Sequence, residues 1–136
     1  MRFLLDTMVL SERGKRRPDE HVGRWFRTVG DDQLLTSVIV FGEIAAGIAK
    51  KRATDPAFAD RLTEWSEATR LEFLDRTLPV STAVALRWGG LSIVLKRRDL
   101  DLLIAATAVE HDLTVVTRNV RHFEPTGVKL LNPYEA

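Results

Sequence analysis

The chain has 136 residues, the size of one domain, and its 45% hydrophobic and 29% charged fractions are ordinary for a globular protein and wrong for a disordered one. It contains no cysteine, which excludes disulfide scaffolds, thiol catalysis, iron–sulfur clusters and zinc sites with cysteine ligands. Its 20 basic and 19 acidic residues leave a net charge of +1, so the total charge does not mark a nucleic-acid-binding protein.

Short apolar runs that suit buried strands alternate along the chain with stretches whose apolar residues recur at helical spacing. The expected strands are residues 3–5, 34–37, 78–80, 113–117 and 128–131. The expected helices are residues 21–29, 38–51, 55–76, 82–95 and 101–112. This alternation predicts an α/β fold with a central parallel sheet of four to five short strands, flanked by helices.

The chain carries no sign of a second domain or of a targeting segment. Its five prolines are spread out and form no linker, so we expect a single domain over residues 1–136. The opening MRFLLDTMVL lacks the apolar core and the cleavage site of a signal peptide, and the apolar runs are too short to span a membrane. The sequence therefore predicts a cytoplasmic protein with no membrane partner.

Acidic residues occur where a parallel sheet binds its ligands, which is beyond the carboxyl ends of the strands. Asp6 follows the first expected strand, and Glu43 lies about one and a half turns into the helix after the second. Asp99 and Asp101 open the helix that begins near Leu100. We therefore expect acids from remote parts of the chain near one edge of the sheet. Taken alone, Asp6 is explained equally well as a helix cap and as a metal ligand. Solvation is the better explanation of Glu43 alone, and the preference of acids for helix N-termini is a strong explanation of Asp99 and Asp101.

A metal ion held by these acids would be a hard divalent cation. The three histidines, His21, His111 and His122, form no pair at helical spacing, which disfavours haem, copper and histidine-rich zinc sites. Carboxylates brought together repel one another, and a cation relieves that repulsion. Because Mg²⁺ and Mn²⁺ accept oxygen ligands, the pattern is typical of a magnesium or manganese site.

Basic residues cluster at residues 13–17, 50–52 and 96–98. Solvated loops and helix ends explain each cluster alone. The third cluster, Lys96, Arg97 and Arg98, directly precedes Asp99. A cationic segment beside an acidic metal site suits a phosphodiester substrate.

Four segments together resemble the PIN-domain family, and within it the VapC-type ribonuclease toxins of toxin–antitoxin modules. They are FLLDTMVLSE, SVIVFGEIAAGI, DLDLLIAATAVEHDLTVVTRNVRHFE and the closing VKLLNP, and they cover nearly the whole chain in order. The resemblance implies a central parallel sheet and a metal-dependent endoribonuclease, the toxin of a type II pair, that hydrolyses RNA with Mg²⁺ or Mn²⁺. It also implies a cognate VapB-type antitoxin, an RNA substrate and a homodimer.

The resemblance assigns roles position by position. Asp6, Glu43 and Asp101 match the catalytic and metal-binding acids of the family. Asn119 stands where many relatives have a fourth acid, and Asp99 could contribute through water. Thr117 matches a polar residue near that site, and we add Thr7 as a second supporting residue. From their charge and position, we expect contacts to the RNA backbone from Arg118, Lys96, Arg97 and Arg98.

Two positions depart from the family. Met8 replaces the asparagine of the usual DTN, and methionine offers no hydrogen-bond donor. Asn119 leaves three firm carboxylates, which favours one tightly held metal. Met8 leaves open an alternative, a catalytically weakened PIN domain that serves as an antitoxin- or RNA-binding module.

A receiver-like regulatory domain is disfavoured, because no acid follows Val116 and Lys129 lies inside the last expected strand. A nucleotide-binding enzyme is disfavoured as well, since the chain has no glycine-rich phosphate loop.

Overall fold

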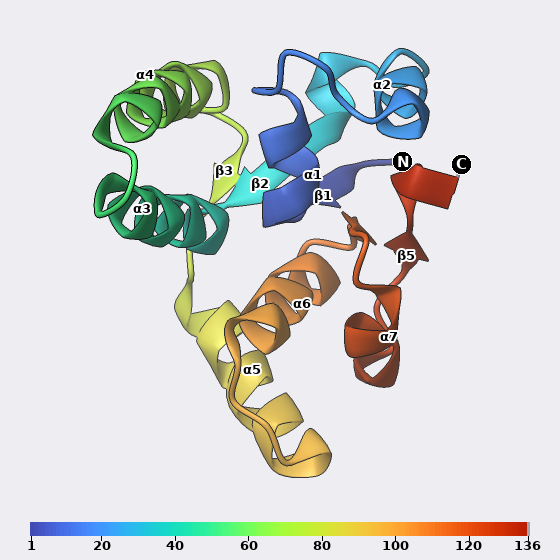
Figure 1. Ribbon diagram of the computed structural model, residues 1–136. Helices are drawn as coiled ribbons and strands as arrows, with labels where there is room; N and C mark the ends of the chain where they lie inside the picture. The colour runs from blue at the N-terminus through green and yellow to red at the C-terminus, as the bar shows by residue number, and fades with distance from the viewer. Residues whose placement is uncertain (136) are drawn as a thin grey trace.

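The computed structural model describes residues 1–135, and within them five strands form one parallel sheet in the order β3-β2-β1-β4-β5 (Figure 1). The strands are β1 (Phe3–Leu5), β2 (Leu34–Ser37), β3 (Thr77–Leu78), β4 (Thr114–Val116) and β5 (Leu130–Leu131). The helices are α1 (Thr7–Glu12), α2 (Glu20–Phe26), α3 (Val38–Arg52), α4 (Pro56–Glu72), α5 (Thr82–Leu95), α6 (Leu100–Glu110) and α7 (Val120–Phe123). Short 3-10 helices are η1 (Asp31–Gln33), η2 (Glu124–Thr126) and η3 (Pro133–Glu135). The predicted α/β fold with a central parallel sheet is confirmed.

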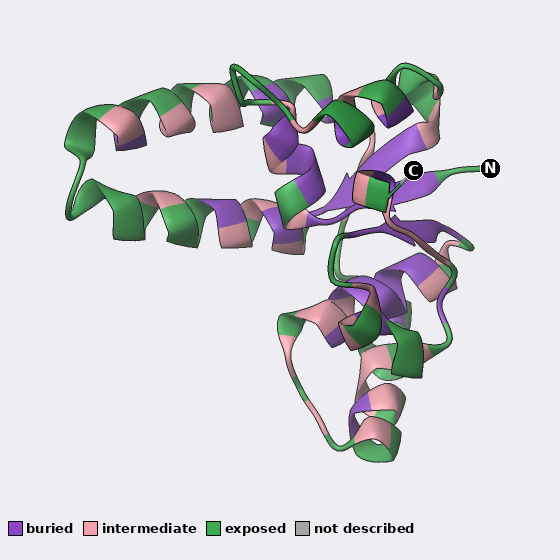
Figure 2. Ribbon diagram, turned by 45° about the vertical axis from the view of Figure 1, so that its right-hand side comes forward, coloured by how far each residue is buried: buried purple, intermediate pink, exposed green. Residues whose placement is uncertain are grey.

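The core lies where β1 and β4 run side by side through the centre of the sheet. All residues of both strands are buried, which is why these strands read as short continuous apolar runs. Helices α1 and α2 lie above the sheet, and α5 and α6 lie below it, in both Figure 1 and Figure 2. Helix α6 contributes fully buried Ile104, Ala105 and Ala108 to the core.

The strand order reverses between β1 and β4. We call the region beyond the carboxyl ends of these two strands the crevice, the term used for this place in open α/β sheets. From β1 the chain runs outward to β2 and β3, and it then returns to β4 on the other side of β1. The connection that leaves β1 leads toward one edge of the sheet, and the connection that leaves β4 leads toward the other. In open α/β sheets, ligands bind at the point where two such connections diverge. The register pairs Leu5 with Val116, so Asp6 and Thr117 follow the two strands at the same level.

Several predicted boundaries shift for local reasons. The helix expected over residues 21–29 ends at Phe26, where the hydroxyl of Thr28 donates to the carbonyl of Trp25 at 2.7 Å. The strand expected over residues 78–80 is Thr77–Leu78, because Pro79 has no N–H to donate to a neighbouring strand. The four-residue helix α7 was not predicted, since it is too short to carry a periodic pattern.

Two helical hairpins extend from the sheet. Helices α3 and α4 pack against each other, as do α5 and α6 (Figure 1). Figure 2 shows that the ends of α3 and α4 far from the sheet are largely exposed. Within residues 1–135, no helix combines the length and the apolar character needed to cross a membrane.

Candidate functional site

Asp6 stands at the carboxyl end of β1 and is only 9% exposed. Its Oδ1 accepts a 2.8 Å hydrogen bond from the backbone N–H of Thr7, so it caps α1. Its Oδ2 accepts a 2.8 Å bond from the hydroxyl of Thr117, which is fully buried at the end of β4. That hydroxyl in turn accepts from the backbone N–H of Asn119 at 3.0 Å. The predicted capping role of Asp6 is confirmed, and the same contacts fix its carboxylate at the crevice.

Glu43 reaches the crevice from the second turn of α3. Its Oε1 accepts a 2.8 Å hydrogen bond from the hydroxyl of Thr7. Thr7 therefore contacts both acids, Asp6 through its backbone and Glu43 through its side chain. The hydroxyl of Ser37 caps α3 by accepting from the backbone N–H of Val40, which sets the helix start directly after β2. The short connection explains why a glutamate in this helix lies near the strand ends.

Asp101 completes the group from the first turn of α6. The pKa of its carboxyl is raised to about 6, mainly by burial and also by the charges of Asp6 and Glu43, while His122 opposes the shift. One carboxylate oxygen from each of Asp6, Glu43 and Asp101 lies within 4.8 Å of the others. We call these three residues the acidic cluster. The raised pKa reports a site in which a third negative charge is costly until a cation is present.

The acidic cluster fits a divalent cation of the magnesium class. Its donors are all carboxylate oxygens, which hard cations prefer. Two of the three carboxylates are already oriented by threonine hydroxyls, as outer-shell hydrogen bonds orient the ligands of metal sites. The chemistry of the donor set, rather than any single residue, makes this a candidate metal centre.

Asp99 is placed beside the acidic cluster but has partners of its own. Its Oδ1 accepts from the N–H of Leu102 at 3.1 Å and caps α6. Arg97 forms a two-pronged ion pair with it, with Nε 2.6 Å from Oδ2 and Nη2 2.8 Å from Oδ1. These bonds hold the pKa of the Asp99 carboxyl well below its usual range and raise the pKa of Arg97. The predicted cationic segment is thus partly neutralised by the acid that follows it.

His122 is a residue of the site region that the sequence did not indicate. Its Nε2 lies 3.3 Å from Oδ2 of Asp101 and 2.7 Å from Nη2 of Arg97. The histidine belongs to α7, whose placement below β4 brings it next to the start of α6. Spacing along the sequence carried no signal for this contact, because it joins residues 21 and 25 positions apart.

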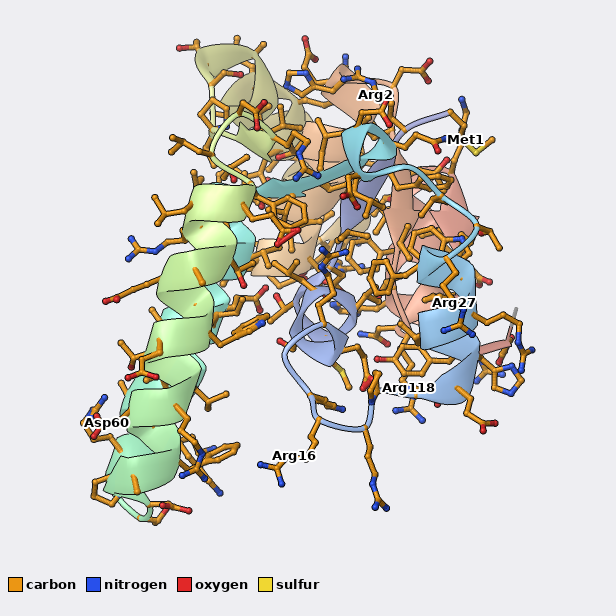
Figure 3. All side chains as sticks on the ribbon, turned by 90° about the horizontal axis from the view of Figure 1, so that it is seen from above. Met1, Arg2, Arg16, Arg27, Asp60 and Arg118 are labelled. Carbon is orange, nitrogen blue, oxygen red and sulfur yellow. The ribbon has the colours of Figure 1, made fainter. Side chains whose placement is uncertain are left out.

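The other predicted site residues are exposed. Asn119 precedes α7 with an exposed side chain. Arg118 is exposed, and its guanidinium lies 4.7 Å from the ring centre of Tyr134. Lys96 and Arg98 are exposed on either side of Arg97, and Met8 is 52% exposed in α1. Figure 3 shows Arg118 on the same side of the molecule as Arg16, which extends from the loop after α1.

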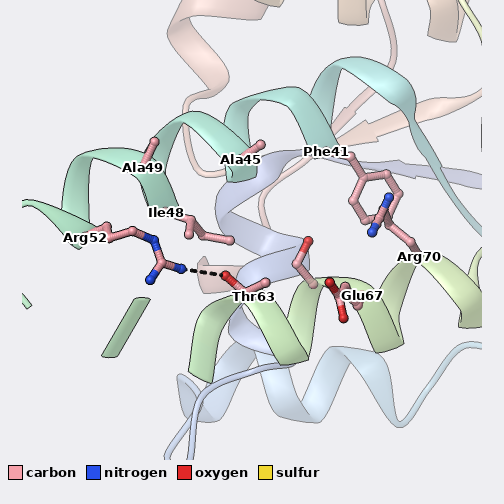
Figure 4. A pocket seen from close by; sticks show the side chains of 9 residues that line it. Phe41, Ala45, Ile48, Ala49, Arg52, Thr63, Glu67 and Arg70 are labelled. Atoms are coloured by element: carbon pink, nitrogen blue, oxygen red, sulfur yellow. Dashed lines mark hydrogen bonds between the residues drawn. The ribbon is translucent and has the colours of Figure 1, made fainter. Parts of the chain in front are cut away.

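A separate groove runs between α3 and α4 (Figure 4). Its volume is about 390 Å³, and it is lined by apolar Phe41, Ala45 and Ile48 from α3 and by polar residues from α4. Arg52 crosses its far end, where Nη2 donates to the hydroxyl of Thr63 at 3.3 Å. Glu43 lies on the same helix but does not line the groove, so the groove and the acidic cluster are distinct places.

The PIN domain family matches residues 3–127 of this chain. The VapC ribonuclease Y4jK of Sinorhizobium fredii is 34% identical, and the match covers 98% of each chain. Toxin FitB of Neisseria gonorrhoeae is 31% identical over 97% of this chain and 98% of the relative. The crystal structure of FitAcB from Neisseria gonorrhoeae superposes with a TM-score of 0.85 at 29% identity, covering 98% of this chain and 99% of that one. The chain therefore matches these proteins over nearly their whole length.

Proposed function

Since this chain belongs to the PIN domain family, we propose that it is a metal-dependent endoribonuclease and the toxin of a type II toxin–antitoxin pair. The names of two relatives, a VapC ribonuclease and a toxin, support the activity and the biological role. The observation that carries the proposal is the acidic cluster, in which the carboxylates of Asp6, Glu43 and Asp101 converge at the crevice between β1 and β4.

We assign the acids distinct tasks. Asp6 and Asp101 bind Mg²⁺ or Mn²⁺ directly, and Glu43 binds it or orients the attacking water. When bound, the divalent ion neutralises charge on the phosphate and lowers the pKa of a water that attacks phosphorus. Thr117 holds Asp6 and Thr7 holds Glu43, each through a 2.8 Å hydrogen bond, so two of the carboxylates are oriented before the substrate arrives. Asn119 and Asp99 do not add a firm ligand in this assignment.

We assign the phosphate contacts to Lys96, Arg98 and Arg118. All three are exposed cations next to predicted site residues along the chain, since Lys96 and Arg98 precede Asp99 and Arg118 follows Thr117. An exposed ammonium or guanidinium is the kind of group that contacts the phosphates of an RNA backbone. Arg97 was predicted to join them. Its Nε and Nη2 are committed to Asp99 and its Nη1 to the carbonyl of His122, so it has little capacity left for phosphate.

We further propose a VapB-type antitoxin and a second copy of the chain as partners. An active ribonuclease requires an inhibitor, and the relative named a toxin supports such a pairing. The groove between α3 and α4 combines apolar lining with exposed small residues of α3, which suits an amphipathic segment of a partner.

The alternative, a catalytically weakened domain that binds RNA or antitoxin, depends on Met8. Its side chain is 52% exposed in the first turn of α1, directly after Thr7, and a thioether cannot donate a hydrogen bond to Asp6 or Glu43. On this alternative, Met8→Asn raises cleavage sharply above that of the unchanged protein. An unaltered cleavage rate in Met8→Asn would remove the reason for it.

Cleavage of total cellular RNA tests the main proposal. The purified protein is incubated with Mg²⁺, with Mn²⁺ and with EDTA, in parallel with Asp6→Asn and with Asp75→Asn as a matched control. Asp75 is an acid exposed on the surface, so its loss should leave the site intact. We expect discrete fragments that require metal, persist in Asp75→Asn and vanish in Asp6→Asn. Equal cleavage by all three proteins would contradict the assignment of the acidic cluster.

A further inference from the structure

A second group of possible metal ligands adjoins the acidic cluster. One ligand atom from each of Asp99, Asp101 and His122 lies within 4.8 Å of the others. Asp101 is shared by both groups. Two carboxylates and an imidazole are a set that Mn²⁺ or Zn²⁺ accepts, so the ligand atoms alone do not explain why a metal should choose one group over the other.

The guanidinium of Arg97 is seated among these ligands. Its Nε and Nη2 lie 2.6 and 2.8 Å from the two carboxylate oxygens of Asp99. Its Nη2 also lies 2.7 Å from Nε2 of His122, and its Nη1 donates to the backbone carbonyl of His122 at 2.7 Å. A guanidinium can only donate, so a hydrogen bond at this contact requires the tautomer of His122 that carries its proton on Nδ1. In that tautomer the bond uses the Nε2 lone pair that a metal ion would need. Both oxygens of Asp99 are engaged in the same way.

We propose that Arg97 is the built-in cation of the group formed by Asp99, Asp101 and His122, and that it confines the divalent ion to the acidic cluster. The inference rests on the metal site of the proposed function and adds a rule for where the metal binds. The fixed positive charge of Arg97 repels a divalent cation from this group. Its guanidinium also occupies two of the group's three ligands, Asp99 and His122. Arg97 thereby acts as a positioning residue that ties the start of α6 to α7.

The placement of Arg97 follows from the backbone before it. Lys96 ends α5 in the left-handed region, with φ 55°, which turns the chain sharply between α5 and α6. The backbone N–H of Arg97 then donates to the carbonyl of Ser92 at 3.2 Å, which fixes the residue at the turn. The neighbours Lys96 and Arg98 remain exposed, whereas the side chain of Arg97 is 20% exposed. Position, rather than charge alone, distinguishes Arg97 from its neighbours.

Counting bound Mn²⁺ tests the proposal without reference to activity. Isothermal titration with MnCl₂ is carried out on the purified chain and on Arg97→Met, which keeps the length of the side chain but removes its donors. We expect the unchanged chain to bind about one Mn²⁺ and Arg97→Met to bind about two, because Asp99 and His122 become available. Arg121→Met removes an exposed arginine of α7 and should still bind about one. Adding His122→Ala to Arg97→Met should return the number to about one.

His122→Ala in the otherwise unchanged chain gives a second test that does not depend on the folding of Arg97→Met. The backbone bond from Nη1 of Arg97 survives this substitution, since it ends on the carbonyl of residue 122. We expect Mn²⁺ affinity to change by less than about threefold, whereas the loss of a ligand or its direct support costs about 10- to 100-fold. A loss in the larger range, or a single Mn²⁺ in folded Arg97→Met when the unchanged chain also binds one, would overturn the proposal.

The outcomes also separate this inference from the proposed function. If the unchanged chain binds no Mn²⁺ but Arg97→Met binds one, the acidic cluster is not a metal site while the role of Arg97 stands. If neither binds Mn²⁺, both are wrong.

Discussion

The hydroxyl of Thr117 donates a 2.8 Å hydrogen bond to Oδ2 of Asp6, joining two buried residues that are 111 positions apart in the chain. The bond exists because β1 and β4 are neighbours in the sheet and end at the same level. It connects the two strands at the reversal of strand order, and it leaves Asp6 one defined orientation toward Glu43 and Asp101. The geometry of the acidic cluster is therefore built into the centre of the fold.

Thr117→Val should weaken both the fold and the metal site. Valine has nearly the same shape but neither donates to Asp6 nor accepts from the N–H of Asn119, so a buried carboxylate loses a partner. We expect a loss of about 1–3 kcal/mol in the free energy of unfolding, measured by urea denaturation. Thr114→Val is the matched control, because Thr114 is also buried and lies in β4, the strand that Thr117 directly follows. Equal losses in the two variants would contradict the role of the bond.

Without metal, the chain should lose stability as the pH rises from about 4 to about 6. The pKa of Asp101 is raised to about 6 in the folded chain, while an unfolded aspartate titrates near 4. In this window the folded state holds the proton and the unfolded state does not, so the free energy of unfolding falls as the pH rises. The loss is at most about 3 kcal/mol, and Asp101→Asn should abolish it. Urea denaturation in EDTA across this range is the measurement, and an equal slope in Asp101→Asn would contradict it.

Mn²⁺ should stabilise the folded chain and should bind more tightly at pH 7 than at pH 5. Binding requires the ionised form of Asp101, whose pKa of about 6 makes it largely protonated at pH 5. At a free concentration 100 times the dissociation constant, the gain is about 2.7 kcal/mol. Thermal denaturation with and without MnCl₂ measures the effect. Asp75→Asn should gain as much as the unchanged chain, and a gain of the same size in Asp6→Asn would show that the ion binds elsewhere.

Thr7 offers a substitution that separates its two contacts. Thr7→Val removes the hydroxyl that donates to Glu43 but keeps the backbone N–H that donates to Asp6. We expect metal affinity and RNA cleavage to fall by about 10- to 100-fold, as for other residues that orient metal ligands. Thr7→Ser retains the hydroxyl and should restore most of both. If serine performs no better than valine, the hydrogen bond to Glu43 is not the cause.

The phosphate contacts should appear in the dependence of RNA binding on salt. Arg98→Met and Arg118→Met each remove one exposed cation that we assign to a phosphate contact, so each should raise KM, leave kcat unchanged and reduce the salt slope of binding by about 1. Arg61→Met removes an exposed cation on α4 as a control. Binding curves at several KCl concentrations, with cleavage kinetics beside them, provide the test. A uniform effect of all three substitutions would indicate only a general loss of charge.

The sequence by itself determined the class of fold and the identity of the candidate acids. Apolar runs and helical periodicity depend on neighbouring residues, so they predicted the strands and most helices to within a few positions. Asp6 and Asp101 could be singled out because a residue that follows a strand or opens a helix in a parallel sheet has a known place. The short helix α7 and the end of α2 at Phe26 escaped this reasoning, since a single hydroxyl or a four-residue turn leaves no periodic signal.

Only the tertiary structure decided how these residues meet. Thr7 contacts Glu43 across 36 positions, and Arg97 reaches His122 across 25, so neither contact follows from any local pattern. Arg97 lies in a run of three basic residues that the sequence treats alike, yet the left-handed turn at Lys96 sends it to Asp99 while its neighbours face water. Local interactions specify secondary structure, but the direction and the partners of a side chain depend on elements that the chain brings together only when it folds.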